Sequence, residues 1–383
     1  MPRRTIDPSP PEGSSFVPPA SARTPAGVGG RATAGGTRRY AERMAARTED
    51  FYRALPRGLT VGALGIGTYL GDCTDEDDAA YADTVRAAIA SGVNVLDTAI
   101  NYRCQRSERA VGRAVERAIA DGVAQRDELV ICSKGGYVAL DGQPPASREE
   151  YDAFIECELI RPGIVARDEL VRGGHSIAPG YLAHQLAQSR GNLRTQAIDV
   201  YYVHNPEEQL LAVDRVTFRL RMRAAFALLE ERVAAGEIGA YGCATWNGFR
   251  VPPEHKQHLP LAELVAIARE VGGTAHHFQF VELPVSLAMP EAARVATQPL
   301  GRKTATLLEA AHALGIGVVA SAPLMQGKLT HDLPDAVREL FPECATDAQR
   351  ALRFTTSLPG VCVALAGMRR PRHLRENLDA WRA

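Results

Sequence analysis

Lysine is scarce in this 383-residue chain: of 44 lysines and arginines, only four are lysines, Lys134, Lys256, Lys303 and Lys328. A GC-rich coding sequence explains this arginine bias most simply, so the remaining lysines are candidates for roles that arginine does not fill. An excess of charge of either sign is also missing, because the formal net charge is −1. This balance gives no support to nucleic-acid binding or to attachment at a membrane surface through charge.

Long apolar runs and paired cysteines are absent as well. No apolar stretch approaches the roughly 20 residues that cross a bilayer. The seven cysteines are scattered and odd in number, and none forms a C-x-x-C pair. Several lie in apolar runs typical of strands, where cysteine behaves as a small hydrophobic residue. We therefore expect a reduced, cytoplasmic protein that does not span a membrane.

Large apolar residues are nearly missing from the first fifty residues, which are rich in proline, glycine, alanine, serine and arginine. Such a segment cannot bury enough surface to offset its chain entropy, so residues 1–50 are expected to be a disordered tail. The twin arginines near the start are not followed by an apolar segment, which argues against an export signal. A role as a transit peptide stays open. A short helix within 38–55 is expected to join the tail to the body of the protein, 57–383.

From residue 62 onward, short runs rich in valine and isoleucine alternate with longer segments of helical period. This alternation is typical of β-α units on a parallel sheet, and eight such units predict a (β/α)8 TIM barrel. A doubly wound open sheet is the alternative, but the G-x-G-x-x-G motif that often follows its first strand is missing. The expected strands are 63–69, 94–99, 128–134, 198–204, 238–245, 276–283, 317–323 and 361–368. The expected helices are 75–92, 107–122, 181–193, 218–237, 261–273, 304–317, 346–360 and 370–383.

Polar residues stand at the ends of three consecutive predicted strands. Asp97 ends the second strand and Tyr102 follows in its loop, Lys134 ends the third strand, and His204 ends the fourth. Each has a simpler explanation alone, because an aspartate often caps a helix, a tyrosine often packs in a loop, and a histidine often just ends a strand. A barrel gathers the C-terminal ends of its strands at one mouth, so the four residues together favour an active site there.

The chemistry of these four residues is mutually consistent. A partly desolvated Lys134 ammonium needs a carboxylate, which Asp97 on the adjacent strand can provide. The ammonium is expected to favour the ionised form of the Tyr102 phenol, whose reference pKa is near 10, and so to make the phenol a proton donor near neutral pH. His204 beside it can orient a substrate carbonyl by a hydrogen bond. What this group lacks is a source of electrons, because no side chain gives hydride.

The last strand and helix can hold such a source. Residues 366–378 run from a strand into a helix N-terminus, where barrels often bind phosphate. Arg369, Arg370 and Arg372 lie in that turn and suit an extra phosphate such as the 2′-phosphate of NADP. The alternative is that they are ordinary surface arginines of an arginine-rich chain.

These residues resemble the aldo/keto reductase superfamily, and the resemblance covers nearly everything from about residue 57 to the C-terminus. In that family an Asp, a Tyr, a Lys and a His form the catalytic tetrad at the ends of strands two to four. The resemblance implies bound NADPH, or NADH in its place, without a Rossmann fold, and hydride transfer to an aldehyde or ketone. The motifs that carry it are "LDTAINY" with Asp97 and Tyr102, "SERAVGRAV", "CSKGG" with Lys134, "YYVHNP" with His204, and Gly367 to Asn377, which fits G-x-(R/K)-(R/K)-P-x-x-x-x-E-N.

The resemblance also assigns roles to single residues. Tyr102 would be the general acid, Lys134 and Asp97 would tune it, and His204 would orient the carbonyl. Gln279 would hydrogen-bond the nicotinamide amide, and the segment 370–377 would contact the adenosine phosphate and the adenine. The cofactor contacts implied are Gly67, Thr68, Thr245, Asn247, Gln279, Ser321, Pro323, Leu324, Gly367, Arg369, Arg370, His373, Glu376 and Asn377.

The chain departs from the family pattern at several cofactor positions. Ala244 and Thr245 stand where the family commonly has Ser-Asn, and Ser321 stands where a tyrosine often stacks on the nicotinamide. His373 stands where arginine or glutamine is frequent. These changes indicate a divergent subfamily, in which Trp246 is a candidate to compensate for a lost contact.

A long insertion, 135–176, separates the third strand from its helix. Many relatives cover the substrate with a C-terminal tail, whereas this chain stops after its eighth helix. Because the insertion begins at the mouth of the barrel, we expect it to form a lid in place of the tail. The alternative is a subdomain without a role at the site.

The main functional hypothesis is an NADPH-dependent oxidoreductase that reduces an aldehyde or ketone to an alcohol. One alternative is a redox-neutral epimerase or dehydratase on the same scaffold, and another is a nicotinamide-nucleotide sensor with little turnover. The expected partner is a small carbonyl substrate, and neither nucleic acid nor a membrane is expected to bind. The sequence leaves the oligomeric state open. Metal catalysis is not expected, because neither "HHFQ" nor "EHKQHLP" brings a ligand set at the required spacing.

Overall fold

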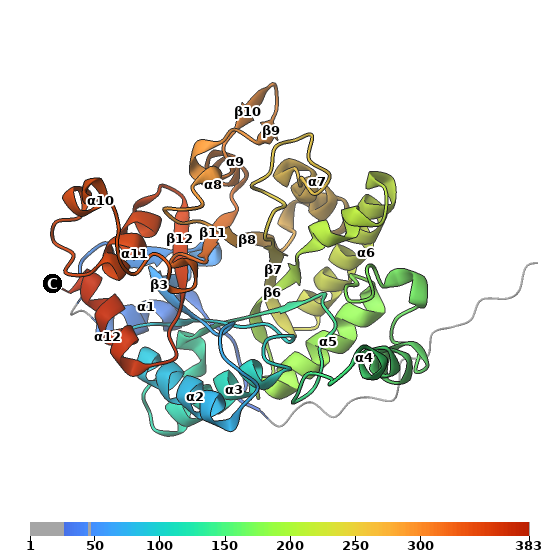
Figure 1. Cartoon of the computed structure of the whole chain (residues 1–383), viewed down its shortest axis with the longest axis horizontal. Helices are drawn as coiled ribbons and strands as arrows, with labels where there is room; N and C mark the ends of the chain where they lie inside the picture. The colour runs from blue at the N-terminus through green and yellow to red at the C-terminus, as the bar shows by residue number, and fades with distance from the viewer. Residues whose placement is uncertain (1–26, 45–46, 383) are drawn as a thin grey trace, which may run out of the picture.

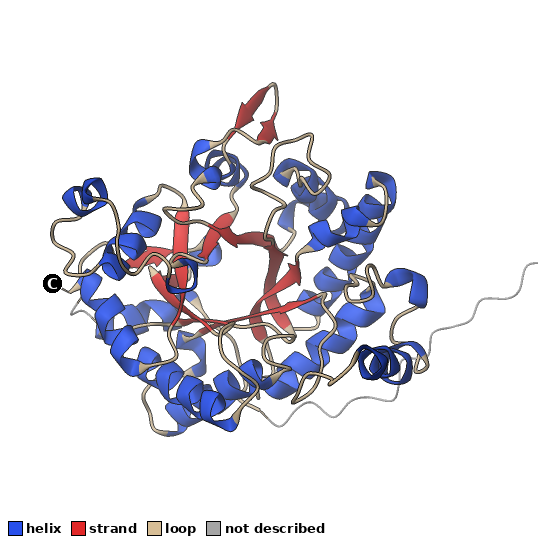
Figure 2. Cartoon of the chain, viewed as in Figure 1, coloured by secondary structure: helices blue, strands red, loops and turns tan. Residues whose placement is uncertain are grey.

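The computed structural model describes residues 27–44 and 47–382. Eight parallel strands form a closed barrel, drawn in red at the centre of Figure 2. The strands follow one another around the ring in chain order, and the last strand pairs with the first. This confirms the predicted (β/α)8 barrel and its eight strands, whose ends lie within two residues of the expected ones. The strands are β3 (Leu64–Gly67), β4 (Val95–Asp97), β5 (Val130–Gly135), β6 (Ile198–His204), β7 (Ile238–Ala244), β8 (Phe278–Pro284), β11 (Gly317–Ser321) and β12 (Val361–Gly367).

Helices surround the barrel and return the chain from the end of one strand to the start of the next (Figure 1). Threonines set the starts of three of them: Thr74, Thr306 and Thr346 each accept a hydrogen bond from a backbone N–H three residues on. Such N-caps satisfy groups that a helix start otherwise leaves unpaired. The eight expected helices are confirmed as α2 (Asp75–Ala90), α3 (Arg106–Ala120), α5 (Pro179–Asn192), α6 (Arg215–Ala234), α7 (Leu261–Gly272), α9 (Leu307–Leu314), α11 (Asp347–Ser357) and α12 (Pro371–Leu378).

Two apolar layers hold the fold together, one inside the barrel and one between the strands and the helices. There are two layers because parallel strands are covered on both faces. The outer layer contains more buried residues than the inner one. The inner layer fills the barrel with alternate side chains of the strands. Its buried residues are Leu55, Leu59, Val61, Val95, Val130, Cys132, Val200, Tyr202, Ala240, Ala244, Phe280, Val319, Val363 and Leu365.

The segment before the barrel is folded against it. Helix α1 (Ala34–Arg43) places Tyr40 in the core, where its hydroxyl donates to the carbonyl of Ile89. Arg43 pairs with the buried Glu128 at 2.8 Å. The expectation of disorder up to residue 50 therefore does not hold for α1, because tertiary contacts order a segment that has little apolar surface of its own. Residues 1–26 of that expected tail lie outside the described residues.

A short hairpin follows α1 and closes the N-terminal end of the barrel. Strands β1 (Tyr52–Ala54) and β2 (Thr60–Gly62) pair antiparallel. Leu55, Leu59 and Val61 of this hairpin belong to the inner layer of the barrel, beside residues at the starts of barrel strands. With that end filled, a ligand site belongs at the opposite, C-terminal end of the strands.

The insertion 135–176 forms a small subdomain with its own core. It contains α4 (Arg148–Phe154) and one turn of π-helix, η3 (Ile155–Ile160). Figure 1 shows α4 beside α5, outside the ring of strands. Its core joins it to Tyr181 of α5, and the buried members are Val138, Ile155, Leu159, Val165 and Tyr181.

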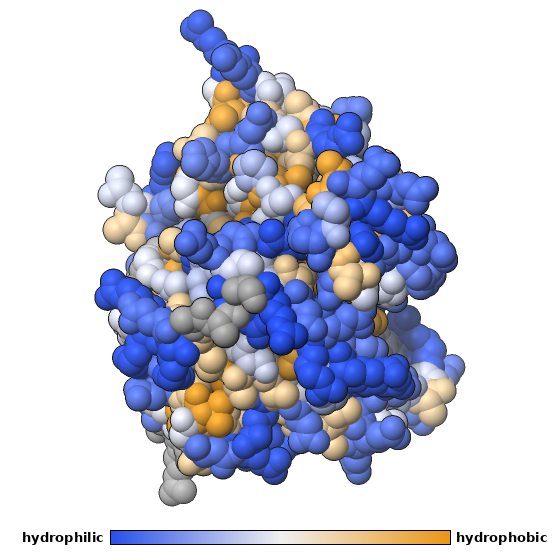
Figure 3. Space-filling model, turned by 90° about the vertical axis from the view of Figure 1, so that its left-hand side faces the viewer, coloured by the Kyte–Doolittle hydropathy of each residue, from blue (hydrophilic) through white to orange (hydrophobic). Residues whose placement is uncertain are grey.

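Short helices and a hairpin lie in the loops that follow the later strands. Helix α8 (Glu291–Arg294) and the hairpin of β9 (Gln298–Leu300) and β10 (Lys303–Ala305) lie between β8 and α9, and α10 (Asp335–Leu340) lies between β11 and α11. Hydrophilic residues dominate the face drawn in Figure 3, with apolar residues scattered among them. Within the described residues, no helix is both long and apolar enough to cross a membrane.

Candidate active site

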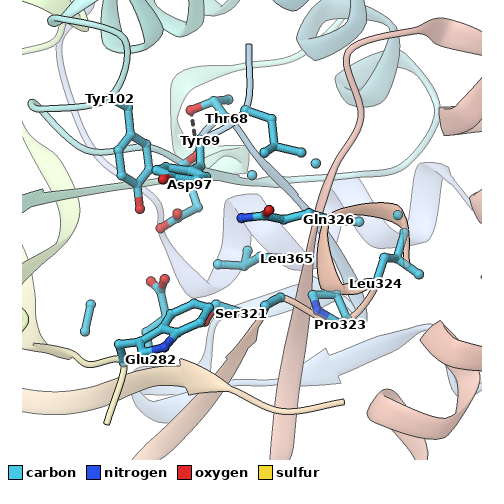
Figure 4. A pocket seen from close by; sticks show the side chains of 18 of the residues that line it. Thr68, Tyr69, Asp97, Tyr102, Glu282, Ser321, Pro323, Leu324, Gln326 and Leu365 are labelled. Carbon is cyan, nitrogen blue, oxygen red and sulfur yellow. Dashed lines mark hydrogen bonds between the residues drawn. The ribbon is translucent and has the colours of Figure 1, made fainter. Parts of the chain in front are cut away.

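A cavity of about 810 Å³ lies at the C-terminal ends of the barrel strands. It brings together residues from the loops after β3 and β4, the ends of β6, β7 and β8, the loop after β11, and α12. Figure 4 shows Tyr102, Asp97 and Glu282 on one side of it, with Ser321, Pro323 and Leu324 on the side toward the loop after β11. The cavity thus joins two regions that the sequence predicted separately, the polar strand ends and parts of the C-terminal segment 366–378.

The centre of the site is the buried ammonium of Lys134. Lys134 is fully buried, and its Nζ donates to Asp97 Oδ1 and to the carbonyl oxygen of Thr98 at 3.1 Å. A second carboxylate, Glu282, places Oε2 at 3.3 Å from the same Nζ. Strands β4 and β5 are direct neighbours in the barrel, which explains why Asp97 and Lys134 meet as predicted.

The electrostatics of this cluster follow from its burial. Burial opposes the charged form of Lys134, but the carboxylates Asp97 and Glu282 outweigh it and hold the pKa of the ammonium well above its usual value. Burial raises the pKa of Asp97, against the attraction of Lys134. Burial and the negative charge of Asp97 raise the pKa of Glu282 to about 8, although Lys134 lowers it. One ammonium therefore faces two carboxyl groups, of which Glu282 retains its proton at neutral pH.

Tyr102 lies over this cluster, with Lys134 Nζ 5.3 Å from the centroid of its ring. Desolvation raises the pKa of the phenol above its usual value, and the negative charges of Glu282 and Asp97 raise it further. The ammonium of Lys134 lowers this pKa, as predicted, but does not outweigh the other effects. The expectation of a net shift toward the phenolate is therefore wrong. The phenol is held protonated, which is the form a proton donor needs.

The loop that carries Tyr102 has an unusual backbone. Arg103, Cys104 and Gln105 follow it with φ values of 50°, 52° and 67°, in the left-handed region that non-glycine residues rarely adopt. Side chains hold this conformation in place: Arg103 Nε donates to the carbonyl of Asp72 at 2.8 Å, and its guanidinium pairs with Asp78. The tight turn thereby fixes the start of α3 and the position of the phenol over the cavity.

His204 lies beside Tyr102 with the ring centroids 5.9 Å apart. Burial, helped by the positive charge of Lys134, lowers the pKa of His204 well below its usual value, so the imidazole is neutral. Its Nδ1 is buried and has no hydrogen-bond partner among the described residues. A neutral imidazole at this position can hydrogen-bond a substrate oxygen without competing with Tyr102 as the proton donor.

Two residues of the insertion, His175 and Tyr137, contact His204. His175 Nε2 donates to the carbonyl oxygen of His204 at 2.7 Å, which leaves His175 Nδ1 to accept from Gln209 Nε2 at 2.8 Å. The ring of Tyr137 packs edge-on against His204. Tyr137 is the one residue of 135–176 that lines the cavity within the described part of the chain. The lid role expected for the whole insertion stays a prediction, and the contact with the cavity is confined to Tyr137.

The structure brings most of the predicted cofactor residues to the cavity but leaves four outside its lining. Gln279 lies on β8 where its pairing with β7 shifts register, between Phe278 of the outer core and Phe280 of the inner layer, and it does not line the cavity. Arg369 is paired with Asp77 of α2 and Arg370 is exposed at the N-cap of α12, while Asn247 Nδ2 donates to Gln257 at 3.1 Å. The residues that do line it are Gly67, Thr68, Thr245, Ser321, Pro323, Leu324, Gly367, His373, Glu376 and Asn377.

Two site residues escaped the sequence analysis, Glu282 and Tyr137. The criterion that found Lys134 and His204, a polar residue at the end of an apolar strand, also applies to Glu282 at the end of "FQFVEL". The family resemblance pointed to Gln279 in the same strand instead. Tyr137 has no comparable signal, because its place beside His204 depends on how the insertion folds.

A closed parallel barrel with a buried acid, lysine and histidine and a half-buried tyrosine at its C-terminal mouth defines a class of barrel enzymes that work by proton transfer. Comparison with known proteins specifies the class. The model of the aldo/keto reductase family matches residues 63–255, about half of the chain. The chain belongs to the aldo/keto reductase family.

Individual relatives are distant. The chain is 25% identical over 339 residues to a D-threo-aldose 1-dehydrogenase from Pseudomonas sp, a match that covers 85% of this chain and 91% of that protein. Among solved structures, an aldo/keto reductase from Klebsiella pneumoniae in complex with NADP and acetate superposes with a TM-score of 0.56 at 19% identity, covering 86% of this chain and 89% of the other. The holo form of the aldo-keto reductase AKR11C1 from Bacillus halodurans gives a TM-score of 0.53 at 19% identity, covering 86% and 90%. At this identity the structures support the fold alone.

Proposed function

We propose that this protein is an NADPH-dependent oxidoreductase that reduces an aldehyde or ketone to an alcohol, with Tyr102 as the general acid. The observation that carries the proposal is the phenol of Tyr102 above the buried pair of Lys134 and Asp97, with the imidazole of His204 alongside, at one end of a cavity that continues to α12. Family membership supports the reaction class.

Each of the four side chains has a separate role in the proposed carbonyl reduction. His204 hydrogen-bonds the carbonyl oxygen through its neutral ring and directs that oxygen toward the phenol of Tyr102. Tyr102 Oη then gives its proton to the oxygen as negative charge develops there, and Lys134 stabilises the phenolate that remains. Asp97 keeps Lys134 charged and in place. NADPH, when bound, supplies the hydride.

The residues that line the rest of the cavity fit a nicotinamide nucleotide. Thr245 Oγ1 is buried at the cavity and has no partner among the described residues, so it is free to bond a polar ligand. At the other end Glu376 and Asn377 of α12 line the cavity. The exposed side chains of Arg370 and Arg372 flank the N-terminus of α12 and suit the 2′-phosphate of NADPH. Because Arg369 is paired with Asp77, Arg370 and Arg372 are the arginines that we assign to this phosphate.

A direct test combines cofactor binding with a panel of carbonyl compounds. Titration of the full chain with NADPH and, separately, NADH should quench protein fluorescence or shift the nicotinamide emission, with tighter binding of NADPH. Oxidation of bound NADPH should then depend on an added aldehyde or ketone. Failure of both nucleotides to bind, or binding without carbonyl-dependent oxidation across aromatic, aliphatic and sugar aldehydes, would refute the proposed function.

A further inference from the structure

We propose that Glu282 is a proton-transfer residue that reloads Tyr102 with a proton through Lys134 after each reduction. The inference rests on the proposed function of the site and adds a step to it. It assigns a role to a buried carboxyl group that the carbonyl reduction described above does not use.

The positions of the three side chains form a continuous path. Strand β8 turns Glu282 into the barrel, where it is 5% exposed, lines the cavity and places Oε2 at 3.3 Å from Lys134 Nζ. Lys134 in turn lies under the ring of Tyr102. Figure 4 shows the carboxyl of Glu282 and the hydroxyl of Tyr102 pointing toward each other from opposite sides, with the carboxyl of Asp97 between them. Lys134 therefore contacts both the carboxyl of Glu282 and the ring of Tyr102.

Two oxygens of the cluster lack a donor. Asp97 Oδ2 and Glu282 Oε2 are both buried, and neither receives a hydrogen bond from a described residue. Two carboxylates beside a single ammonium leave one negative charge uncompensated, which is costly in a desolvated site. A proton held on Glu282 removes that charge and supplies a donor for Asp97. The raised pKa of Glu282, about 8 through burial and the charge of Asp97, agrees with this arrangement.

Other titratable groups around Glu282 do not compete for this role. Burial raises the pKa of Cys132 and of Tyr202 well above their usual values, so both stay neutral and give up no proton at neutral pH. The titratable groups that face Glu282 are Asp97 of β4, Lys134 and Cys132 of β5, Tyr202 of β6 and Tyr102 of the loop after β4.

The step moves one proton along three groups and no electrons. Once Tyr102 has given its proton to the carbonyl oxygen, an N–H of Lys134 breaks and its proton forms the O–H bond of Tyr102. The O–H of Glu282 then breaks, and its proton restores the ammonium of Lys134. Glu282 is left as a carboxylate at the wall of the cavity, where it takes up one proton from the bulk solvent between turnovers, the proton that carbonyl reduction consumes overall. Alcohol oxidation runs the same path in reverse.

Kinetics of the variants Glu282→Gln and Glu282→Asp test this path. We expect Glu282→Gln to carry out its first NADPH oxidation within about twofold of the wild-type rate and then to turn over about tenfold or more slowly, because the amide has no acidic proton. Steady-state reduction by the wild type should fall as the pH rises past about 8, and this decline should be absent in Glu282→Gln and partly restored in Glu282→Asp. Glu254→Gln, which changes an exposed carboxylate outside the cavity, is the matched control and should behave as the wild type. Equal turnover and equal pH profiles of Glu282→Gln and wild type would overturn the proposal.

A second measurement does not depend on turnover. Infrared difference spectra across the Glu282 pKa of about 8 should show the loss of one more carboxylic-acid band in the wild type and in Glu254→Gln than in Glu282→Gln, in which only the contribution of Glu207, with a pKa of about 7, is left. If no carbonyl compound is reduced, the proposed function fails, and this titration alone decides whether Glu282 holds the proton. A wild-type spectrum without that band would overturn the inference even in an active reductase.

Discussion

The ring of Tyr137 stands perpendicular to the imidazole of His204, with their centroids 5.1 Å apart and an interplanar angle of 90°. The same ring contacts His175 at 4.9 Å, and its hydroxyl accepts a hydrogen bond from Asn205 Nδ2 at 3.0 Å. Tyr137 and His175 both belong to the insertion, whereas His204 and Asn205 belong to the barrel. The insertion thus holds the group that we assign to carbonyl orientation.

Removal of this ring should therefore weaken catalysis without abolishing it. An aromatic edge-to-face pair contributes about 0.5–1.5 kcal/mol beyond its buried area. We expect Tyr137→Ala to lower kcat/KM for a carbonyl substrate by roughly threefold to tenfold. Tyr137→Phe keeps the ring and loses only the bond to Asn205, so it should stay close to wild type. Unchanged kcat/KM in Tyr137→Ala would show that the insertion does not support His204.

The phenol of Tyr102 should be indispensable for turnover. General acid catalysis contributes about 10²–10⁴-fold, so Tyr102→Phe is expected to lower kcat for carbonyl reduction by that factor and to leave the Kd for NADPH nearly unchanged. Tyr69→Phe is a matched control, because the ring of Tyr69 packs edge-on against Tyr102 at 5.1 Å but is 58% exposed. Substantial activity in Tyr102→Phe would exclude Tyr102 as the acid.

The loop after β7 depends on one buried carboxyl group. Glu207 Oε1 accepts hydrogen bonds from the backbone N–H groups of Trp246, Asn247 and Gly248 at 2.8, 2.9 and 3.3 Å. Glu207→Ala leaves these donors unpaired and should cost on the order of 2–3 kcal/mol of unfolding free energy.

Chemical denaturation measures the stability loss in Glu207→Ala, and the emission of the half-exposed Trp246 reports on the loop itself. The neighbouring Glu208, which accepts from Gln257 Nε2 at 3.3 Å instead, provides the control Glu208→Ala. Equal losses in Glu207→Ala and Glu208→Ala would contradict the role of Glu207 in holding the loop.

The choice between NADPH and NADH should depend on Arg370. A charge-assisted hydrogen bond contributes about 1.5–3 kcal/mol, so Arg370→Ala should weaken NADPH binding about tenfold to a hundredfold and leave NADH binding unchanged. Arg302→Ala, in the exposed turn between β9 and β10, changes the same charge far from the cavity. Equal effects of Arg370→Ala on both nucleotides would remove Arg370 from the 2′-phosphate site.

The sequence predicted those parts of the molecule that local pattern controls. Runs of valine and isoleucine marked the barrel strands, and a polar residue at a strand end marked Asp97, Lys134 and His204, because parallel strands deliver their C-terminal ends to one place. A short helix was expected within 38–55, but helix α1 begins earlier and covers Ala34–Arg43, because its order comes from distant contacts such as the pair of Arg43 with Glu128. The direction of the pKa shift of Tyr102 was also predicted wrongly. It is set by burial, which is a property of the folded chain and not of the local sequence.

Two further features depend on side-chain pairing and direction. The sequence made Arg369 a candidate for phosphate binding, but in the structure Arg369 forms an ion pair with Asp77 of α2. Gln279 and Glu282 share strand β8, but only Glu282 lines the cavity, and the shift of register between β7 and β8 beside Gln279 has no signal in the sequence. Spacing along the chain therefore predicted where the site lies better than which side chains are free to act in it.

Stability against pH gives a last test of the Glu282 proton. In the unfolded chain the carboxyl titrates near 4.5, and in the folded protein near 8. Between these values the folded state binds one more proton than the unfolded state, so rising pH lowers the free energy of unfolding by up to about 1.4 kcal/mol per pH unit. The stability contribution of this proton is fully present below the unfolded pKa and is lost as the pH passes the folded pKa.

Glu282→Gln cannot lose a proton and should lack this component. Urea unfolding of both proteins from about pH 5 to about pH 9 should show the wild type losing stability relative to Glu282→Gln up to about pH 8 and running parallel to it above that value. The difference removes the contributions of other groups, such as Glu207, whose pKa burial raises to about 7. Glu254→Gln should follow the wild type throughout. Parallel curves for wild type and Glu282→Gln over the whole range would mean that Glu282 is ionised in the folded protein, and then no proton is stored beside Lys134.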